Sequence, residues 1–189
     1  MKVAILHEGT EDFKLLKQLA NSLSYDFDGM VEPYKIGRKS NFFKAGNTDY
    51  RELIQQIEAD QIDKVLFVLD ADDPANDRIY GGYENTQKAL NTIIDELVLG
   101  PIAQSFICCN PETKLGNVES LLLSTLDDEK KACIEHFLKC SEFGAPDDAK
   151  AVLNSIYQKG FPRAPYNYDH ENFDELKEKL GWLLTPSTY

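Results

Sequence analysis

Residues 65–73 read VLFVLDADD, an unbroken apolar run that ends in a group of aspartates. An apolar run of this length predicts a strand that is buried on both faces, which is typical of a parallel sheet covered by helices. Strands disfavour aspartate, so the acidic residues mark the carboxyl end of this strand. In open parallel sheets, ligands bind beyond the carboxyl ends of the strands.

Strand and helix patterns alternate outward from this segment. Further strands are predicted at residues 2–6, 31–36 and 102–108, and helices at 10–22, 49–59 and 84–99. This order predicts an α/β fold with an open, mainly parallel sheet flanked by helices. After residue 117 only helical patterns follow, at 118–123, 128–139, 147–158 and 173–184. We therefore expect an α/β domain over residues 1–125 and an all-helical C-terminal extension over residues 126–189 that packs on the same domain.

The charge of the chain limits the partners that it can bind. The formal net charge is -12 over 189 residues. Such a charge opposes non-specific binding to nucleic acid or to an anionic membrane, so a polyanionic substrate requires a cation or a local basic patch. The apolar run at 2–6 is too short for a signal peptide, and no stretch is long enough for a transmembrane helix. We expect a cytoplasmic protein that does not associate with membranes.

Acidic residues follow three of the predicted strands. Glu8 comes after the first strand, Asp70, Asp72 and Asp73 follow the third, and Glu119 begins a helix beyond the fourth. The carboxyl ends of parallel strands share one edge of the sheet, so these side chains are expected to lie close together. Two carboxylates about 4 Å apart repel by roughly 4 kcal/mol at an effective dielectric of 20. A shared proton or a bound cation relieves this repulsion.

The donor atoms and their spacing favour a magnesium or manganese ion. Hard oxygen ligands select Mg²⁺ or Mn²⁺, and Mg²⁺ completes its shell with water and phosphate oxygens. On an extended chain, the Asp-x-Asp spacing points the side chains of Asp70 and Asp72 in the same direction. The alternative is structural, because Asp72 or Asp73 can cap the next segment and Glu119 suits the first turn of its helix.

In this order, the acidic motifs resemble the Toprim domain of topoisomerases, primases and related nucleases. The resemblance covers residues 1 to 125 and rests on Glu8-Gly9, on the strand that ends in Asp70-Ala71-Asp72, and on Gly116 to Glu119. It extends to small stand-alone prokaryotic Toprim-like proteins and to the Toprim half of the overcoming-lysogenization-defect nucleases.

The resemblance implies roles for the acidic residues. Glu8 is expected to act as a general acid/base or metal ligand, while Asp70 and Asp72 hold Mg²⁺. Glu119 and Asp73 are the candidates for holding a second ion. His7 departs from the apolar residue that usually precedes the glutamate in this family.

Basic candidates are few in this acidic chain. Arg38, Lys39 and Lys44 bracket Phe42 and Phe43. Basic residues with aromatics hold the backbone of a nucleic acid strand and stack on its bases, so these three cations are predicted to bind substrate. The alternative is a solvated loop with its phenylalanines tucked beneath it.

Lys114 is the one basic residue predicted to take part in catalysis. It lies in the loop before Glu119 and is a candidate for offsetting charge on a phosphoryl transition state.

Two functional hypotheses follow from these observations. The first is a Mg²⁺-dependent protein that processes phosphodiesters, most simply a nuclease acting on nucleic acid or another phosphoester. The alternative is a non-catalytic module that binds nucleotide or a partner protein and works with another protein such as an ATPase. The proposed metal chemistry fails if Glu8 points away from Asp70 and Asp72, or if a lysine or arginine lies among the three as their neutralising partner.

Overall fold

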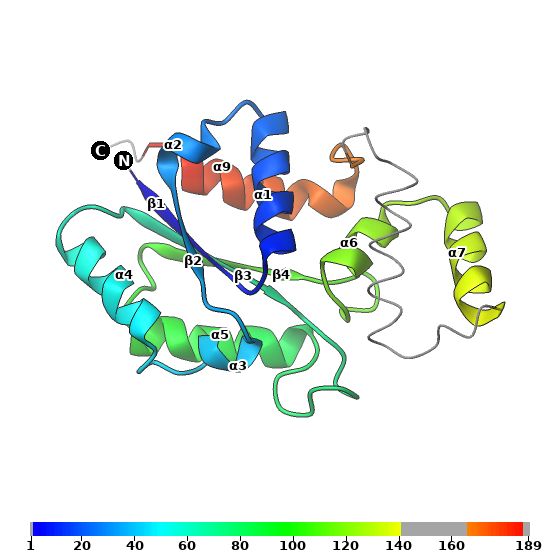
Figure 1. Cartoon of the computed structure of the whole chain (residues 1–189), viewed down its shortest axis with the longest axis horizontal. Helices are drawn as coiled ribbons and strands as arrows, with labels where there is room; N and C mark the ends of the chain where they lie inside the picture. Colours follow the sequence, from blue (N-terminus) through cyan, green and yellow to red (C-terminus); the bar gives the residue numbers. More distant parts are fainter. Residues whose placement is uncertain (1, 141–165, 187–189) are drawn as a thin grey trace.

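The computed structural model describes residues 2–140 and 166–186, and its centre is a four-stranded sheet (Figure 1). The strands are β1 (Val3–His7), β2 (Val31–Lys35), β3 (Lys64–Asp70) and β4 (Ala103–Cys108). They run parallel in the order β2-β1-β3-β4. The predicted α/β class with an open parallel sheet flanked by helices is confirmed.

The helices follow the predicted ranges closely. They are α1 (Thr10–Ser22), α2 (Phe27–Met30), α3 (Lys39–Phe42), α4 (Thr48–Glu58), α5 (Tyr83–Glu96), α6 (Val118–Ser124), α7 (Asp128–Cys140), the 3-10 helix η1 (Glu171–Phe173) and α9 (Asp174–Leu184). The four-residue helices α2 and α3 were not predicted, because they are too short to show a helical period. The helix predicted at 147–158 lies outside the described residues.

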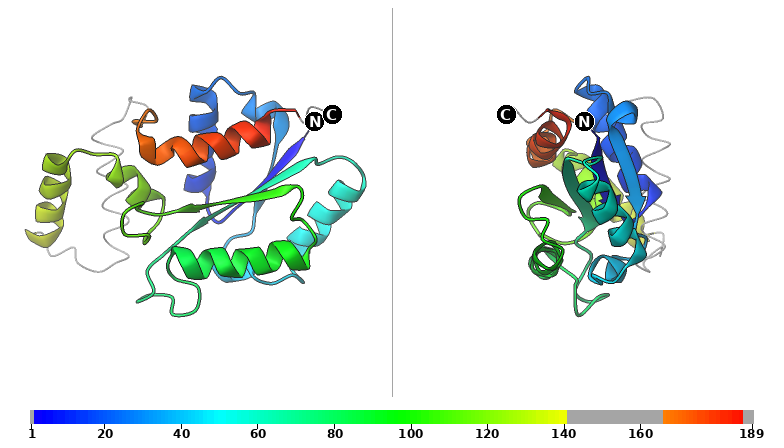
Figure 2. Two further views of the ribbon diagram at one scale, coloured as in Figure 1. Left: turned by 180° about the vertical axis from the view of Figure 1, so that it is seen from behind. Right: turned by 90° about the vertical axis from the view of Figure 1, so that its left-hand side faces the viewer.

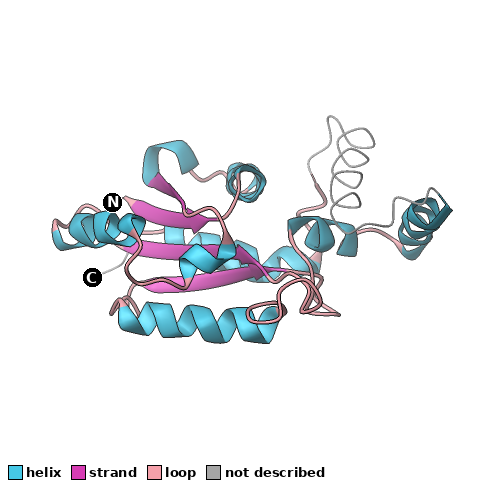
Figure 3. Cartoon of the chain, turned by 60° about the horizontal axis from the view of Figure 1, so that its bottom comes forward, coloured by secondary structure: helices cyan, strands magenta, loops and turns pink. Residues whose placement is uncertain are grey.

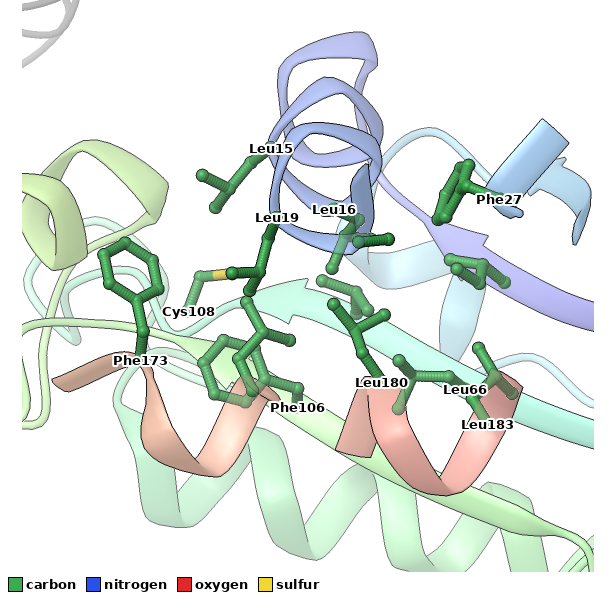
Figure 4. Close-up of a cluster of buried hydrophobic side chains, with 14 of the residues drawn as sticks. Leu15, Leu16, Leu19, Phe27, Leu66, Phe106, Cys108, Phe173, Leu180 and Leu183 are labelled. Carbon is green, nitrogen blue, oxygen red and sulfur yellow. The ribbon is translucent and has the colours of Figure 1, made fainter. Parts of the chain in front are cut away.

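Helices cover both faces of the sheet, and the strand residues alternate between two apolar clusters (Figure 3). Ile5 of β1 belongs to one cluster. The same cluster includes Leu16 of α1 and Leu180 of α9, which Figure 4 labels. The next residue, Leu6, belongs to the opposite cluster, which includes Leu90 of α5. Burial on both faces explains why the strands read as continuous apolar runs.

The last described helix is fastened to the start of β3 by a buried lysine. Lys64 donates hydrogen bonds to the carbonyl oxygens of Trp182 (2.7 Å) and Thr185 (2.8 Å), at the C-terminal end of α9. Its Nζ also lies 5.2 Å from the centroid of the Trp182 ring. The apolar face of α9 packs into the same cluster as α1, whereas α7 lies apart from the sheet beyond α6 (Figure 2).

The strand order reverses between the two central strands, β1 and β3. From β1 the chain passes through α1 to β2, and from β3 it passes through α5 to β4, on the other side of the sheet. The two connections also cover opposite faces. Ligands of open α/β sheets bind at such a reversal of strand order. Within 2–140 and 166–186, no helix is long and apolar enough to cross a membrane.

Candidate functional site

Glu8 lies at the reversal point and links the two central strands. It follows β1, and its Oε1 accepts a hydrogen bond from the backbone N–H of Asp70 at the end of β3 (3.1 Å). The pKa of Glu8 is raised to about 7, chiefly by burial and further by the carboxylates of Asp72 and Asp12, against the N–H of Asp70 and the Lys39 ammonium. Carboxylates from distant parts of the chain therefore act on one another here.

Asp70 closes β3 and ties it to α6. Its side chain is buried, and its Oδ1 accepts a hydrogen bond from the backbone N–H of Val118 (3.1 Å). Asn117 caps the same helix, since its side chain accepts from the backbone N–H of Ser120. One oxygen of Asp70 thus has a structural partner in the first turn of α6.

Asp72 is not extended, so the expected reason for its orientation is wrong. Its φ is +60°, in the left-handed region that aspartate tolerates better than most residues. An isolated antiparallel bridge to Gly116 fixes it, with Asp72 N–H to Gly116 O at 2.6 Å and the reverse bond at 3.1 Å. Gly116 has a φ of +95°, and a Cβ there would collide with the side chain of Ser120. The bridge, and not strand alternation, sets the direction of Asp72.

Lys39 lies inside the site and not on its surface. Only 6% of the residue is exposed, and its Nζ donates to the carbonyl of Ala71 (2.6 Å) and to Oδ2 of Asp72 (3.2 Å). The structure therefore does not present Lys39 to a substrate in the way that the sequence predicted. A lysine does neutralise one of the carboxylates, which is the condition that argues against an ion at Asp72.

Asp12 belongs to the site and was not predicted as a site residue. It is buried in the first turn of α1, where its Oδ2 accepts a hydrogen bond from the backbone N–H of Gly9 (2.7 Å). Its carboxylate raises the pKa of Glu8. The sequence signal was its place directly behind Glu8-Gly9, but the same position also suits a residue that only stabilises a helix start.

Glu119 lies in the first turn of α6, next to residues of α1. It is buried, and it borders a cavity of about 40 Å³ whose lining also includes Glu11, Lys14 and Tyr166. Its neighbour Val118 bonds to Asp70, so α6 connects this cavity to the end of β3. A role for Glu119 as a ligand of a second ion stays a prediction.

Asp73 and Lys114 take local positions. Asp73 is exposed, and its Oδ1 accepts a hydrogen bond from the backbone N–H of Ala75 (2.8 Å), as expected for a turn residue. The Nζ of Lys114 lies 5.0 Å from the centroid of the Tyr83 ring and borders a separate cavity of about 160 Å³ that also contains Cys109. The structure places Lys114 beside these residues, and its catalytic role stays a prediction.

The two remaining basic candidates are on the surface. Arg38 and Lys44 are exposed on either side of α3, and Lys44 donates to Oδ1 of Asn41 (3.2 Å). Phe42 is fully buried and Phe43 is half-buried. The alternative of a loop that buries its phenylalanines is therefore correct for Phe42 and only partly correct for Phe43.

No ready-made metal cage is present in the part of the chain that the structure describes. In that part, no three His, Cys, Asp or Glu side chains are arranged to hold a metal ion. An ion at this edge would therefore depend on one or two carboxylates together with water, which is how Mg²⁺ commonly binds.

Comparisons with protein-family models, curated proteins and solved structures find no match for this chain. The resemblance to Toprim domains therefore depends on the motifs at Glu8, Asp70 to Asp72 and Gly116 to Glu119.

Proposed function

We propose that this chain is a cytoplasmic, Mg²⁺-dependent protein that processes phosphodiesters, most simply a nuclease of the Toprim type. One observation carries the proposal. Glu8 bonds to the backbone of Asp70 at the reversal of strand order, and the nearby carboxylate of Asp72 raises its pKa. Acidic groups that act on one another at the point where open parallel sheets bind ligands support metal-assisted chemistry.

The donor set is compatible with Mg²⁺ or Mn²⁺. Asp70 and Asp72 provide oxygen ligands, and an ion that keeps several waters needs no larger set. Lys39 supplies a single positive charge beside Asp72, and Glu8 senses Lys39 together with the carboxylates of Asp72 and Asp12. When bound, Mg²⁺ polarises a phosphoryl oxygen and makes a bound water more acidic.

Glu8 is suited to proton transfer. A general acid or base works best when its pKa lies near the working pH, and the pKa of Glu8 is raised to about 7. The N–H of Asp70 holds one oxygen of Glu8 in place. We assign to Glu8 the proton of the attacking water or of the leaving oxygen, and to Lys39 the positioning of Asp72.

The Lys39–Asp72 pair also favours the second candidate function. A buried ammonium that already neutralises one carboxylate lets this edge exist without an ion. A non-catalytic module that binds nucleotide or a partner such as an ATPase would need no more than this.

The experiment that separates the two functions compares site variants with a matched control. Hydrolysis of labelled DNA, RNA and small phosphodiesters is measured with Mg²⁺, Mn²⁺ or EDTA, together with calorimetry of ion binding. Asp70→Asn keeps an acceptor for the N–H of Val118 but removes the charge, and Glu8→Gln does the same toward Asp70. Asp95→Asn removes an exposed charge on α5 and serves as the control.

The nuclease proposal expects ion-dependent hydrolysis that falls at least about 100-fold in both site variants and is unchanged in the control. Thermal unfolding confirms that each variant is folded. Unchanged hydrolysis in both site variants would remove the assignment. Binding of ion or nucleotide with no turnover of any substrate would establish the second candidate instead.

A further inference from the structure

A basic segment reaches the acidic edge of the sheet through Lys39. Residues 33–48 contain four Lys or Arg residues and no Asp or Glu, in a chain whose net charge is -12. Lys39 is buried and forms an ion pair with Asp72, whereas Arg38 and Lys44, on either side of α3, are exposed. Neither of these two cations forms an ion pair with any other described residue. These two exposed cations therefore lie in a segment that has no acidic residue of its own and that contacts Asp72 through Lys39.

A second loop brings an aromatic ring against this segment. In the loop of residues 73–82, the Tyr80 ring lies 4.4 Å from the Phe43 ring, centroid to centroid, with 39° between their planes. Both residues are half-buried, so each pair member keeps part of its surface open. The same loop exposes Arg78, and its neighbour Ile79 is 72% exposed.

The aromatic pair is fixed close to the acidic edge. The hydroxyl of Thr86 donates to the carbonyl of Tyr80 (2.7 Å), and the N–H of Gly82 donates to the carbonyl of Ala71 (2.9 Å). The same carbonyl of Ala71 accepts from Lys39. Rings and carboxylates are thus connected through one residue between Asp70 and Asp72.

We infer that the basic–aromatic rim, which comprises Arg38, Phe43, Lys44, Arg78 and Tyr80, binds a single strand of nucleic acid beside the carboxylates. The inference deepens the proposed function and rests on it for the identity of the reacting phosphodiester. The cations contact phosphates, and the ring pair stacks on a base.

The rings select the single strand over other polyanions. Stacking on a side chain requires an unpaired base with a free face, and the bases of a duplex already stack on one another. An acidic protein segment has the charge but no flat base, so it can use only the cations. A small phosphoester contacts either the cations or the rings, but unlike a nucleic acid strand it does not extend over both.

The test measures binding by the full-length chain in EDTA, where no ion-dependent cleavage occurs. Fluorescence anisotropy follows a labelled oligothymidylate, and a hairpin duplex and poly-glutamate of equal charge serve as competitors. We expect the single strand to bind at least about tenfold more tightly than either competitor. Equal binding of the duplex or of poly-glutamate would overturn the inference, and in the second case the rim would be a docking surface for an acidic protein.

Two double variants separate the cations from the rings. In Arg38→Gln with Lys44→Gln, the slope of log affinity against log salt becomes shallower by about 1.4, or about 0.7 for each lost phosphate contact. In Phe43→Leu with Tyr80→Leu, affinity falls about tenfold with little change in the salt slope. Leucine keeps apolar contacts, and thermal unfolding checks that this variant is folded.

The control removes a cation at the other end of the sheet. Lys2 precedes β1, so Lys2→Gln should leave both affinity and salt slope unchanged. Loss of affinity in this control equal to that of the rim variants would contradict a local site. Binding in EDTA that is lost in the rim variants, together with no hydrolysis in Mg²⁺, would uphold the rim and remove the proposed function. Hydrolysis that the rim variants leave unchanged would remove the rim alone.

Discussion

Two lysines are buried at opposite ends of the same sheet, and their partners differ. Lys64, at the start of β3, is 8% exposed and donates to two backbone carbonyls at the end of α9. Lys39, beyond the carboxyl end of β3, is 6% exposed and donates to one carbonyl and to the carboxylate of Asp72.

The difference separates a structural tether, Lys64 with the carbonyls of Trp182 and Thr185, from part of the proposed reactive site. Neutral carbonyls satisfy the ammonium of Lys64, and this interaction also complements the partial negative charge at the C-terminal end of α9. At Lys39 the partner is itself charged, and Glu8 lies close enough to both to be affected by them. The proposed divalent ion would compete with Lys39 for Asp72, whereas the described hydrogen-bond partners of Lys64 are neutral carbonyls.

The largest expected effect on stability is at the tether. Lys64→Met removes two charge-assisted hydrogen bonds and should lower the free energy of unfolding by about 3 kcal/mol. Urea denaturation measures the loss, and calorimetry should show ion binding unchanged for each folded molecule. A loss of ion binding in this variant would break the contrast between the two ends of the sheet.

The pH dependence of stability reports on Glu8. Its pKa is raised from 4.5 to about 7 in the folded protein, so the folded chain retains a proton that the unfolded chain has lost between these values. In EDTA this stabilising contribution is complete below pH 4.5 and is lost as the pH rises through about 7. Allowing for partial solvation of Glu8, we expect a decrease in the free energy of unfolding of about 2 kcal/mol.

Glu8→Gln isolates this contribution from those of other carboxyl groups. Glutamine still accepts from the N–H of Asp70 but does not titrate. Urea unfolding of both proteins across this pH range should therefore show a difference that grows toward high pH, where only the chain with Glu8 loses stability. Parallel curves for the two proteins would mean that Glu8 ionises normally.

Removing the competing ammonium should strengthen ion binding. In Lys39→Met, Mg²⁺ no longer displaces a positive charge from Asp72, so its affinity should rise about fivefold. Equivalently, saturating Mg²⁺ should stabilise this variant against urea by about 1 kcal/mol more than it stabilises the unaltered chain. An unchanged or weaker affinity would make Lys39 a structural residue like Lys64.

The smallest effect is expected at the exposed pair beside the tether. The Nζ of Lys2 lies 3.6 Å from Oε2 of Glu32, and both side chains are open to solvent. Lys2→Gln should change the free energy of unfolding by no more than about 0.5 kcal/mol, and ion affinity not at all. A larger change in the free energy of unfolding would show that the charge of Lys2 also affects residues other than Glu32.

Regular elements could be predicted because their signals are local. The helix expected at 10–22 is observed as α1, and the apolar run at 65–69 forms most of β3. Periodicity and burial on both faces are properties of neighbouring residues, so they are visible in a sequence. The short helix α3 offers no such period, and its segment was predicted only as a basic loop.

The contacts of the site could not be predicted, because they join residues that are distant in the chain. Lys39 and Asp72 are 33 positions apart, and Glu8 reaches the backbone of Asp70 across 62 positions. The acidic positions followed from their places after strands. The buried lysine and the left-handed bridge at Asp72 depend on how α3 and the loop before α6 pack.

Anomalous diffraction from crystals soaked in Mn²⁺ shows whether an ion binds at this edge of the sheet. We expect a peak coordinated by Asp70 or Asp72 near Glu8, with the Nζ of Lys39 displaced from the carboxylate of Asp72. No peak at saturating Mn²⁺, with Lys39 still bonded to Asp72, would contradict this expectation.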